Sequence, residues 1–292
     1  MRAKLAALCV SVLTSAVVCS AQTAPEATAP ATRQADYSSV YCSGFLSDPK
    51  VPDDSRIVSG EQSSYKIVFG RGDNVYLNRG EDKGVKVGDR YTIVRPDTDP
   101  ANEWFYGQAK LLKGMGTIYK DAGQVRVVNV QAKTSVAEVV FSCDYMQRGD
   151  IARPFEERPL PPFKEAGKFE HFAPVSGKPV GTVVSAFDYH QLLGRGDAAY
   201  VNIGAEKGVK VGDYMRVFRY QGPRDIAASE GEPDYQYKVF GFGGSPTKYP
   251  PKDLPREVIG EGVVLSVTRN AATVLITYSM VDMYAGDYAE IE

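Results

Sequence analysis

Two cysteines are the residues whose type and spacing most clearly define a chemistry. Cys42 and Cys143 lie about 100 residues apart and belong to no Cys-x-x-Cys motif. In an oxidising compartment such an isolated pair forms one disulfide more readily than it serves as a redox-active or nucleophilic thiol. Closing a loop of about 100 residues contributes roughly 4–5 kcal/mol in the chain-entropy description. We therefore expect a structural clasp.

A Gly-Asp dipeptide recurs six times, each time where a strand is expected to end. Glycine permits a positive φ and the aspartate carboxylate accepts a nearby backbone N–H, so the dipeptides are interpreted as turns. Metal binding would require at least three oxygens to converge, whereas these pairs are expected at different corners. The turn residues are Gly72, Asp73, Gly88, Asp89, Gly149, Asp150, Gly196, Asp197, Gly212, Asp213, Gly286 and Asp287.

Residues for catalysis are not recognisable. His171 and His190 have no nucleophile or orienting carboxylate beside them in the sequence. The chain contains no nucleophile elbow, zinc-protease motif, Walker loop or dinucleotide fingerprint. We therefore predict no enzyme activity and no catalytic, cofactor-binding or metal-binding residue. A hydrolase with an unrecognised pair of carboxylates is the alternative.

The composition excludes further classes. The chain has 292 residues, with 34 Lys and Arg against 36 Asp and Glu, for a formal net charge of −2. Without a basic run it is not expected to bind nucleic acid. Two histidines and scattered cysteines do not form an ordinary structural zinc site. With 43% hydrophobic residues the chain is long enough for two domains with cores of their own.

The N-terminus has the features of a signal peptide. Arg2 and Lys4 precede an apolar run from Leu5 to Val18, and small residues then lead to a cleavage site before Gln22. The run is short for a bilayer span. A retained anchor or a lipid on Cys19 remain alternatives. We expect export through residues 1–21, to the periplasm, the outer membrane or the medium, with no integral membrane segment after cleavage.

Next to this segment lies an Ala/Thr/Pro-rich stretch. Residues 22–36 contain no large apolar side chain and cannot form a core, so we expect a flexible tether. The tether is predicted to occupy residues 22–41, ending at Cys42.

An internal repeat defines the architecture. Residues 70–89 match residues 194–213 at fourteen of twenty positions, with an offset of 124. Residues 123–150 align with residues 260–287 at an offset of 137. Each unit has about 100–115 residues, the size of a domain. We predict two β repeat domains, 42–153 and 180–292, joined by a connector at 154–179.

Both units show the pattern of β-structure. β-branched and aromatic runs at 125–130 and 136–141, repeated at 263–267 and 274–278, indicate strands that short breaks join into hairpins. In the repeated GVKVGD segment, Val85 and Val87 are expected on one face of a strand. The only helical period is at 104–112. The expected fold class is all-β, with two tandem homologous small β-barrel or sandwich domains.

The connector and two insertions complete the pattern. Residues 154–179 contain six prolines and should run extended, with Phe155, Phe163, Phe169 and Phe172 able to hold them against a domain. The insertions at 97–116 and 221–257 are rich in aromatic residues, which either bind a partner or cap the domains. The candidate partner-binding residues are Trp104, Phe105, Tyr106, Tyr235, Tyr237, Phe240, Phe242 and Tyr249.

The repeated Gly-Asp-x-x-Tyr-x-Asn-x-Gly-x-x-Lys-Gly-Val-Lys-Val-Gly-Asp pattern, continuing into RYTIVRP or YMRVFRY, resembles the C-terminal domain of bacterial flagellar assembly protein T. Similar β domains accompany peptidoglycan-binding LysM modules in envelope proteins. Together with the segment around Cys42, the pair of domains resembles uncharacterised exported proteins of acidobacterial type. The resemblance implies a fold more than an activity.

These observations predict an exported cell-envelope protein that binds rather than catalyses. Its two domains would present the aromatic loops to a protein assembly. Binding of peptidoglycan or another glycan is the alternative, and hydrolysis of an envelope polymer is the second alternative. No cofactor and no nucleic acid is expected.

Overall fold

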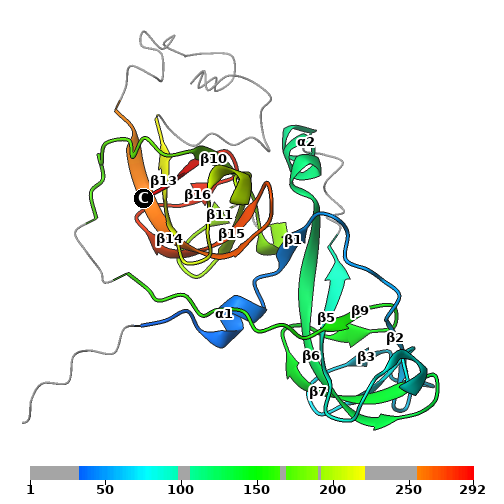
Figure 1. Ribbon diagram of the computed structural model, residues 1–292. Helices are drawn as coiled ribbons and strands as arrows, with labels where there is room; N and C mark the ends of the chain where they lie inside the picture. The colour runs from blue at the N-terminus through cyan, green and yellow to red at the C-terminus, as the bar shows by residue number, and fades with distance from the viewer. Residues whose placement is uncertain (1–32, 98–105, 165–168, 190–191, 221–254) are drawn as a thin grey trace, which may run out of the picture. The chain divides into compact units, whose positions relative to one another are not determined.

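The computed structural model describes residues 33–97, 106–164, 169–189, 192–220 and 255–292 (Figure 1). Strands are the main regular structure of these residues, and each repeat forms a barrel-like sheet with a path of six strands; in the first repeat a seventh strand, β1, also pairs with β6. The predicted all-β class is confirmed, and of the two predicted forms, barrel or sandwich, the second repeat is a closed barrel. Within the described ranges no helix has the length and apolar character needed to cross a membrane.

The first barrel is a sheet that curls until its two outer strands meet. Backbone N–H groups of Ile57 and Ala152 donate to Asp150 O (2.9 Å) and Ser55 O (2.8 Å), which joins the outer strands. Its interior is filled by aliphatic side chains together with Phe69 and Met146. The strand order is β2 (Ile57–Gly60), β4 (Asn74–Leu77), β7 (Ser135–Ser142), β6 (Thr117–Val130), β5 (Arg90–Pro96) and β9 (Ile151–Pro154).

The second barrel repeats this order and is closed through a continuous ladder. Its interior again consists of aliphatic side chains with Met215 and Met283. The strand order is β10 (Val180–Ala186), β12 (Ala198–Val201), β15 (Ala272–Ser279), β14 (Glu257–Val267), β13 (Tyr214–Arg219) and β17 (Tyr288–Ile291). Each strand therefore has a counterpart of the same rank in the first barrel.

Irregular features are repeated as well. The first strand of each barrel carries a bulge, before Ser59 and before Ser185. The predicted hairpins are present, since β6 pairs with β7 and β14 with β15, both antiparallel. Each barrel also has a two-stranded ribbon: β3 (Val68–Phe69) with β8 (Met146–Gln147), and β11 (Leu192–Leu193) with β16 (Met283–Tyr284).

All six Gly-Asp dipeptides form the same corner. Every glycine of the six has a positive φ, between 89° at Gly72 and 108° at Gly286. Every aspartate accepts, through Oδ2, the backbone N–H three residues earlier at 2.8 Å. An amino acid with a Cβ is strained at such a φ, which explains the glycine.

The GVKVGD segments differ from the prediction. They are not strands: each follows a 3₁₀ turn, η1 (Glu81–Lys83) or η3 (Ala205–Lys207), and begins with a left-handed glycine. This geometry removes the period of two, so Val85 is 5% exposed and Val87 is 68% exposed. The two valines do not share a face.

The N-terminal segment from residue 33 to 47, which we call the strap, corrects the end of the predicted tether, whereas residues 22–32 lie outside the described residues, as does the predicted signal peptide. It contains α1 (Tyr37–Tyr41) and β1 (Phe45–Ser47), and it buries Val40 and Tyr41 instead of remaining solvated. The predicted disulfide is confirmed, because Cys42 and Cys143 are bonded and tie the strap to the first barrel.

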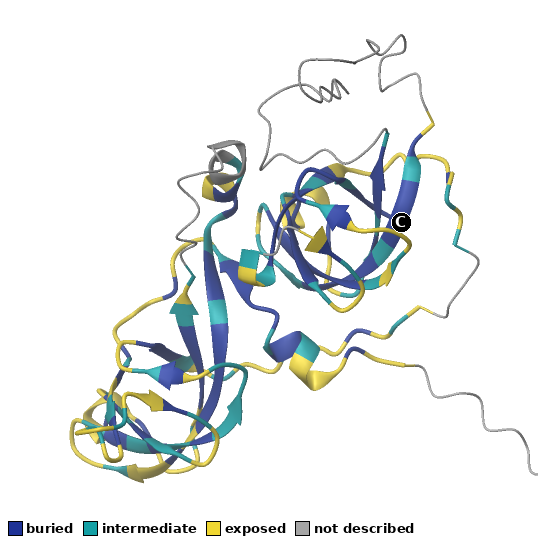
Figure 2. Cartoon of the chain, turned by 180° about the vertical axis from the view of Figure 1, so that it is seen from behind, coloured by how far each residue is buried: buried dark blue, intermediate teal, exposed yellow. Residues whose placement is uncertain are grey.

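The strap also contacts the second barrel. Val40 and Tyr41 pack with Val263, Leu265 and Leu275, and the Tyr200 hydroxyl donates to Ser43 O at 3.1 Å. The predicted short helix is present as α2 (Tyr106–Met115), whose Leu112 and Met115 pack with Val184, Tyr200 and Ala271. The strap and α2 thus pack against apolar residues of the second barrel. Figure 2 shows buried residues concentrated in the strands of both barrels.

The described parts of the connector, 154–164 and 169–179, are partly held in place. Phe155 and Phe163 pack with the strap and the second barrel, and Phe169 lies 4.7 Å from the Tyr278 ring. Phe172 is 59% exposed and contributes little packing. The phenylalanines therefore hold two parts of the connector in place.

Candidate binding surface

Most of the predicted partner-binding aromatics cannot be placed. Trp104, Phe105, Tyr235, Tyr237, Phe240, Phe242 and Tyr249 lie outside the described residues, as does His190. Tyr106 begins α2, but its side chain is also outside them. Their role in binding stays a prediction.

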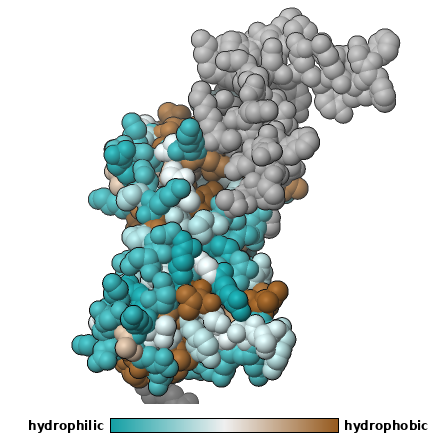
Figure 3. All heavy atoms as spheres, turned by 90° about the vertical axis from the view of Figure 1, so that its right-hand side faces the viewer, coloured by the Kyte–Doolittle hydropathy of each residue, from teal (hydrophilic) through white to brown (hydrophobic). Residues whose placement is uncertain are grey.

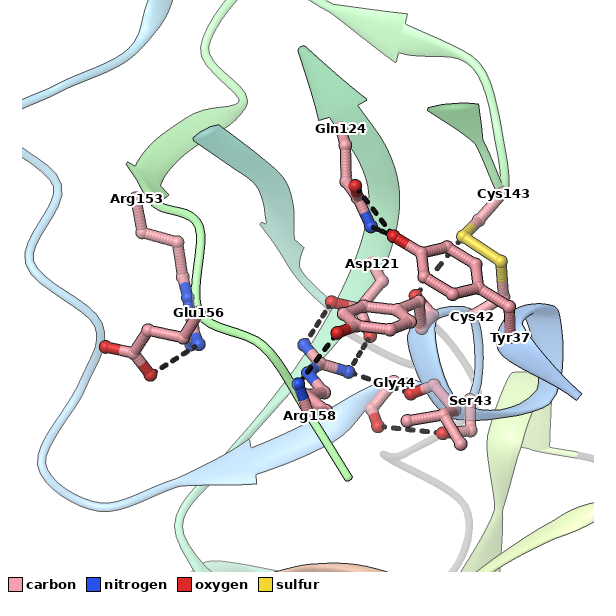
Figure 4. Close-up of polar contacts among 12 residues, drawn as sticks. Tyr37, Cys42, Ser43, Gly44, Asp121, Gln124, Cys143, Arg153, Glu156 and Arg158 are labelled. Atoms are coloured by element: carbon pink, nitrogen blue, oxygen red, sulfur yellow. Dashed lines mark hydrogen bonds and ion pairs between the residues drawn. A yellow bond between two sulfur atoms is a disulfide. The ribbon is translucent and has the colours of Figure 1, made fainter. Parts of the chain in front are cut away.

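Polar residues around the strap form a network that anchors it (Figure 4). Arg158 donates to both oxygens of the buried Asp121 carboxylate, at 2.8 and 3.0 Å, and also to Val40 O. Its backbone N–H donates to the Tyr41 hydroxyl at 2.7 Å. Burial raises the pKa of Asp121, and the Arg158 guanidinium opposes that rise. The Arg158–Asp121 pair therefore has a structural role, because Arg158 also donates hydrogen bonds to Val40 and Tyr41 of the strap.

A second group of contacts lies next to the clasp. The Gln124 amide exchanges hydrogen bonds with the Tyr37 hydroxyl at 2.7 and 2.9 Å, and Arg90 donates to the same amide oxygen at 2.6 Å. The Arg90 guanidinium also lies 3.9 Å from the centre of the Phe155 ring. Residues of β5, β6 and the connector therefore position the strap together.

An arginine–aspartate pair with a buried aspartate occurs at the same place in both barrels. Arg95 contacts Asp150 at 2.7 Å, and Arg219 contacts Asp287 at 2.6 Å. Both aspartates belong to the Gly-Asp corners, so each carboxylate binds a turn and a neighbouring strand at once. Burial raises the pKa of Asp287, with Arg219 opposing it. These carboxylates are used by the fold.

One pair of glutamates has the electrostatics of an acid–base couple. Burial and the neighbouring Glu292 carboxylate raise the pKa of Glu261. Burial also raises the pKa of Glu292, but hydrogen bonds from Lys164 and Arg216 outweigh burial and lower it overall. Sequence reasoning missed this pair, because Glu261 lies in β14 and Glu292 follows β17, and neither carries a motif. The cations neutralise the pair, which gives it a structural role.

A cavity of about 200 Å³ lies between the strap and the second barrel. It is smaller than the 300–1,000 Å³ typical of ligand pockets. The serine hydroxyls of α1 and the Asp197 carboxylate contribute its polar part, and Phe187 and Leu275 its apolar part. Its size limits it to a few water molecules or a very small ligand.

An exposed apolar run on the first barrel is the best candidate surface. Tyr65 is 78% exposed, Ile67 73% and Val68 42%, and Tyr145 beside the paired strand β8 is 48% exposed. We call these four residues the Tyr65–Val68 patch. On one face of the molecule, Figure 3 shows apolar residues at the surface among hydrophilic ones. A cluster of large exposed apolar residues typically marks a contact site.

Among the described residues, no group of three or more His, Cys, Asp or Glu side chains is arranged to hold a metal ion. His171 contacts Val258 O through Nδ1 at 2.8 Å and helps to hold the connector. A scan against protein-family models and a search of curated proteins both find no match.

Proposed function

We propose that this protein is an exported, non-enzymatic scaffold of the bacterial cell envelope that binds a protein partner through its first barrel. The Tyr65–Val68 patch carries the proposal, because it brings several large apolar side chains into solvent, two of them more than 70% exposed. A protein partner would remove this apolar surface from water. The disulfide is in keeping with export to an oxidising compartment.

The strap supports a scaffold rather than two independent modules. It is bonded covalently to the first barrel and packs on the second, so a partner bound to one barrel is linked to the other by more than the connector. The described charged residues nearest the strap are engaged in holding it. A binding protein needs such rigidity, since ordering a loose surface costs free energy on association.

Cross-linking in the source cells, followed by affinity capture and mass spectrometry, tests the proposal. The variant Tyr65→Ser/Ile67→Ser should lose its cross-linked partner and keep its thermal unfolding midpoint. Val128→Ser is the matched control, because Val128 is 41% exposed on the same barrel outside the patch. Capture of flagellar basal-body proteins would connect the sequence resemblance to function. If the patch variant keeps every partner of the wild type, the proposal fails.

A glycan partner is the second candidate. The Tyr65 ring is 78% exposed, and a free aromatic face can stack on a sugar. In that case the purified protein should sediment with purified peptidoglycan, and Tyr65→Ser should abolish sedimentation. A scaffold for proteins alone should remain in the supernatant.

A further inference from the structure

Some residues that are identical between the segments 70–89 and 194–213 are not required by the fold. Most residues that are identical between 70–89 and 194–213 have a visible structural reason. The glycines and aspartates form the corners, and Val85 and Val209 are buried. Asn78 and Asn202 each accept a backbone N–H through Oδ1, at 2.6 and 2.7 Å.

Other identical residues face solvent in both barrels. They are basic or aliphatic, and within the described chain no acidic side chain forms an ion pair with any of the basic ones. Val87 is 68% exposed and Val211 39% exposed. The exposed identical pairs are Arg71/Arg195, Lys83/Lys207, Lys86/Lys210 and Val87/Val211.

The second aligned block shows that the age of the duplication does not explain this. Residues 123–150 and 260–287 are identical at seven of twenty-eight positions. At the positions of the block that are exposed in both barrels the residues differ, with Ala132 against Arg269 and Tyr145 against Asp282. Exposed side chains have therefore diverged where nothing requires them, but not in the Lys-Gly-Val-Lys-Val loops.

We propose that the loops 83–87 and 207–211 are two equivalent contact sites for the same protein partner. In each loop the exposed valine enters an apolar depression of the partner, and the two lysines pair with acidic side chains at its rim. This inference rests on the proposed scaffold function and assigns it a partner with two like sites or two copies. Engaging both loops would raise the overall affinity well above that of one loop.

The charges next to the loops favour a protein over an anionic membrane or polymer. The turn before each loop carries exposed acids, Glu81 and Asp82 in the first barrel and Glu206, which pairs with Arg269 at 3.2 Å, in the second. A uniformly negative surface would repel these acids while it attracted the lysines. A protein surface can place an acidic group opposite each lysine and a neutral or basic group opposite Asp82. The complementary partner is therefore a protein with an acidic rim.

A photo-cross-linking amino acid placed at position 87 or at position 211 tests the inference in the source cells. Both sites should yield the same partner protein, and position 128 is the control site because it is exposed but not retained. Lys83→Glu/Lys86→Glu should lower the yield at position 87 by at least about tenfold, through reversal of two ion pairs. The double variant should keep the thermal unfolding midpoint of the wild type, which shows that it still folds.

The two proposals fail in different ways. The assignment of the loops is overturned if positions 87 and 211 cross-link to different proteins, or if charge reversal leaves the cross-linking yield at position 87 unchanged. Loss of partners in a Tyr65 variant tests the Tyr65–Val68 patch alone. The purified protein can also be mixed with vesicles of phosphatidylglycerol and phosphatidylcholine. If it adsorbs to them, if charge reversal abolishes the adsorption, and if positions 87 and 211 cross-link to no common protein, the loops bind a lipid surface and the protein-partner assignment is overturned.

Discussion

Arg126 and Glu138 face each other on the outside of the first barrel, whereas Val263 and Leu275 occupy the equivalent positions on the second. The first pair forms a solvent-exposed ion pair of 3.0 Å, with side chains 54% and 37% exposed. The second pair is 0% and 5% exposed and lies against the strap. The same fold therefore has a solvent-exposed outer face in the first barrel and a buried outer face in the second.

The difference extends along the strands. In β7 buried and half-buried residues alternate from Ser135 to Val140, as expected for a sheet with one face in water. In β15 the first five residues, from Ala272 to Ile276, are all buried. Both faces of a strand become apolar where a second layer covers the barrel. Burial of the outer face therefore depends on the strap and α2, not on the barrel itself.

Removing the clasp should have the largest effect on this comparison. Cys42→Ser/Cys143→Ser should lower the free energy of unfolding by about 4–5 kcal/mol, because the bond closes a long loop in the unfolded chain. Urea denaturation of the wild type and the variant measures the loss. Hydrogen exchange should increase more at Val263 and Leu275 than at Arg126 and Glu138, since the first two lie under the strap. Equal stability of the two proteins would contradict a structural clasp.

Transferring one residue between the barrels should have the next largest effect. Leu275→Glu buries a carboxylate without a cation and should destabilise the protein by about 3–4 kcal/mol in urea denaturation. The reciprocal change Glu138→Leu removes an exposed ion pair and should cost less than about 1 kcal/mol. Similar costs for the two changes would show that the outer faces do not differ energetically.

The repeated arginine–aspartate pair gives a finer comparison. Asp287→Asn should destabilise by about 2–3 kcal/mol and Asp150→Asn by about 1–2 kcal/mol, because each change leaves an arginine unpaired. The second barrel is expected to lose more, since the Arg219 side chain is 9% exposed and that of Arg95 is 21% exposed. Thermal unfolding of both variants measures the difference, and the reverse order would contradict it.

The smallest effect should be the pH dependence of one corner of the first barrel. The Gly70 N–H and then the Lys66 ammonium lower the pKa of Asp73 below its usual value of 3.8. This lowered pKa stabilises the fold above the unfolded pKa, and the stabilisation is lost as pH falls through the folded pKa. Asp73→Asn should therefore cost less than about 1 kcal/mol at pH 7 and approach zero in acid. A cost that persists below pH 2 would point to another cause.

Features that depend on neighbouring residues could be predicted from the sequence. The corners, the hairpins and the barrel class follow from glycine, aspartate and β-branched residues at short spacing. The disulfide followed because Cys42 had a single expected partner. The prediction that the GVKVGD segments are strands was wrong, because a 3₁₀ turn and a left-handed glycine have no period of two.

Features that join distant segments could not be predicted. The helix α1 has five residues, too few to show a period, and its anchor Arg158 lies more than a hundred residues away. The Glu261–Glu292 pair likewise depends on which strands become neighbours. The aromatic loops were recognisable by composition, but their residues lie outside the described structure, so the prediction about them is still open.

The covered pair Val263 and Leu275 also bears on how such a chain can evolve. A barrel encoded as a single copy must have an outer face that water can wet, a condition that Arg126 and Glu138 satisfy. After a gene duplication, the second copy was free to become apolar once a strap lay over it. From then on the copies are not interchangeable. Deleting the first copy would remove Cys143, the disulfide partner of the strap, and would expose the apolar outer face of the second copy. The duplication can therefore no longer be reversed in one step.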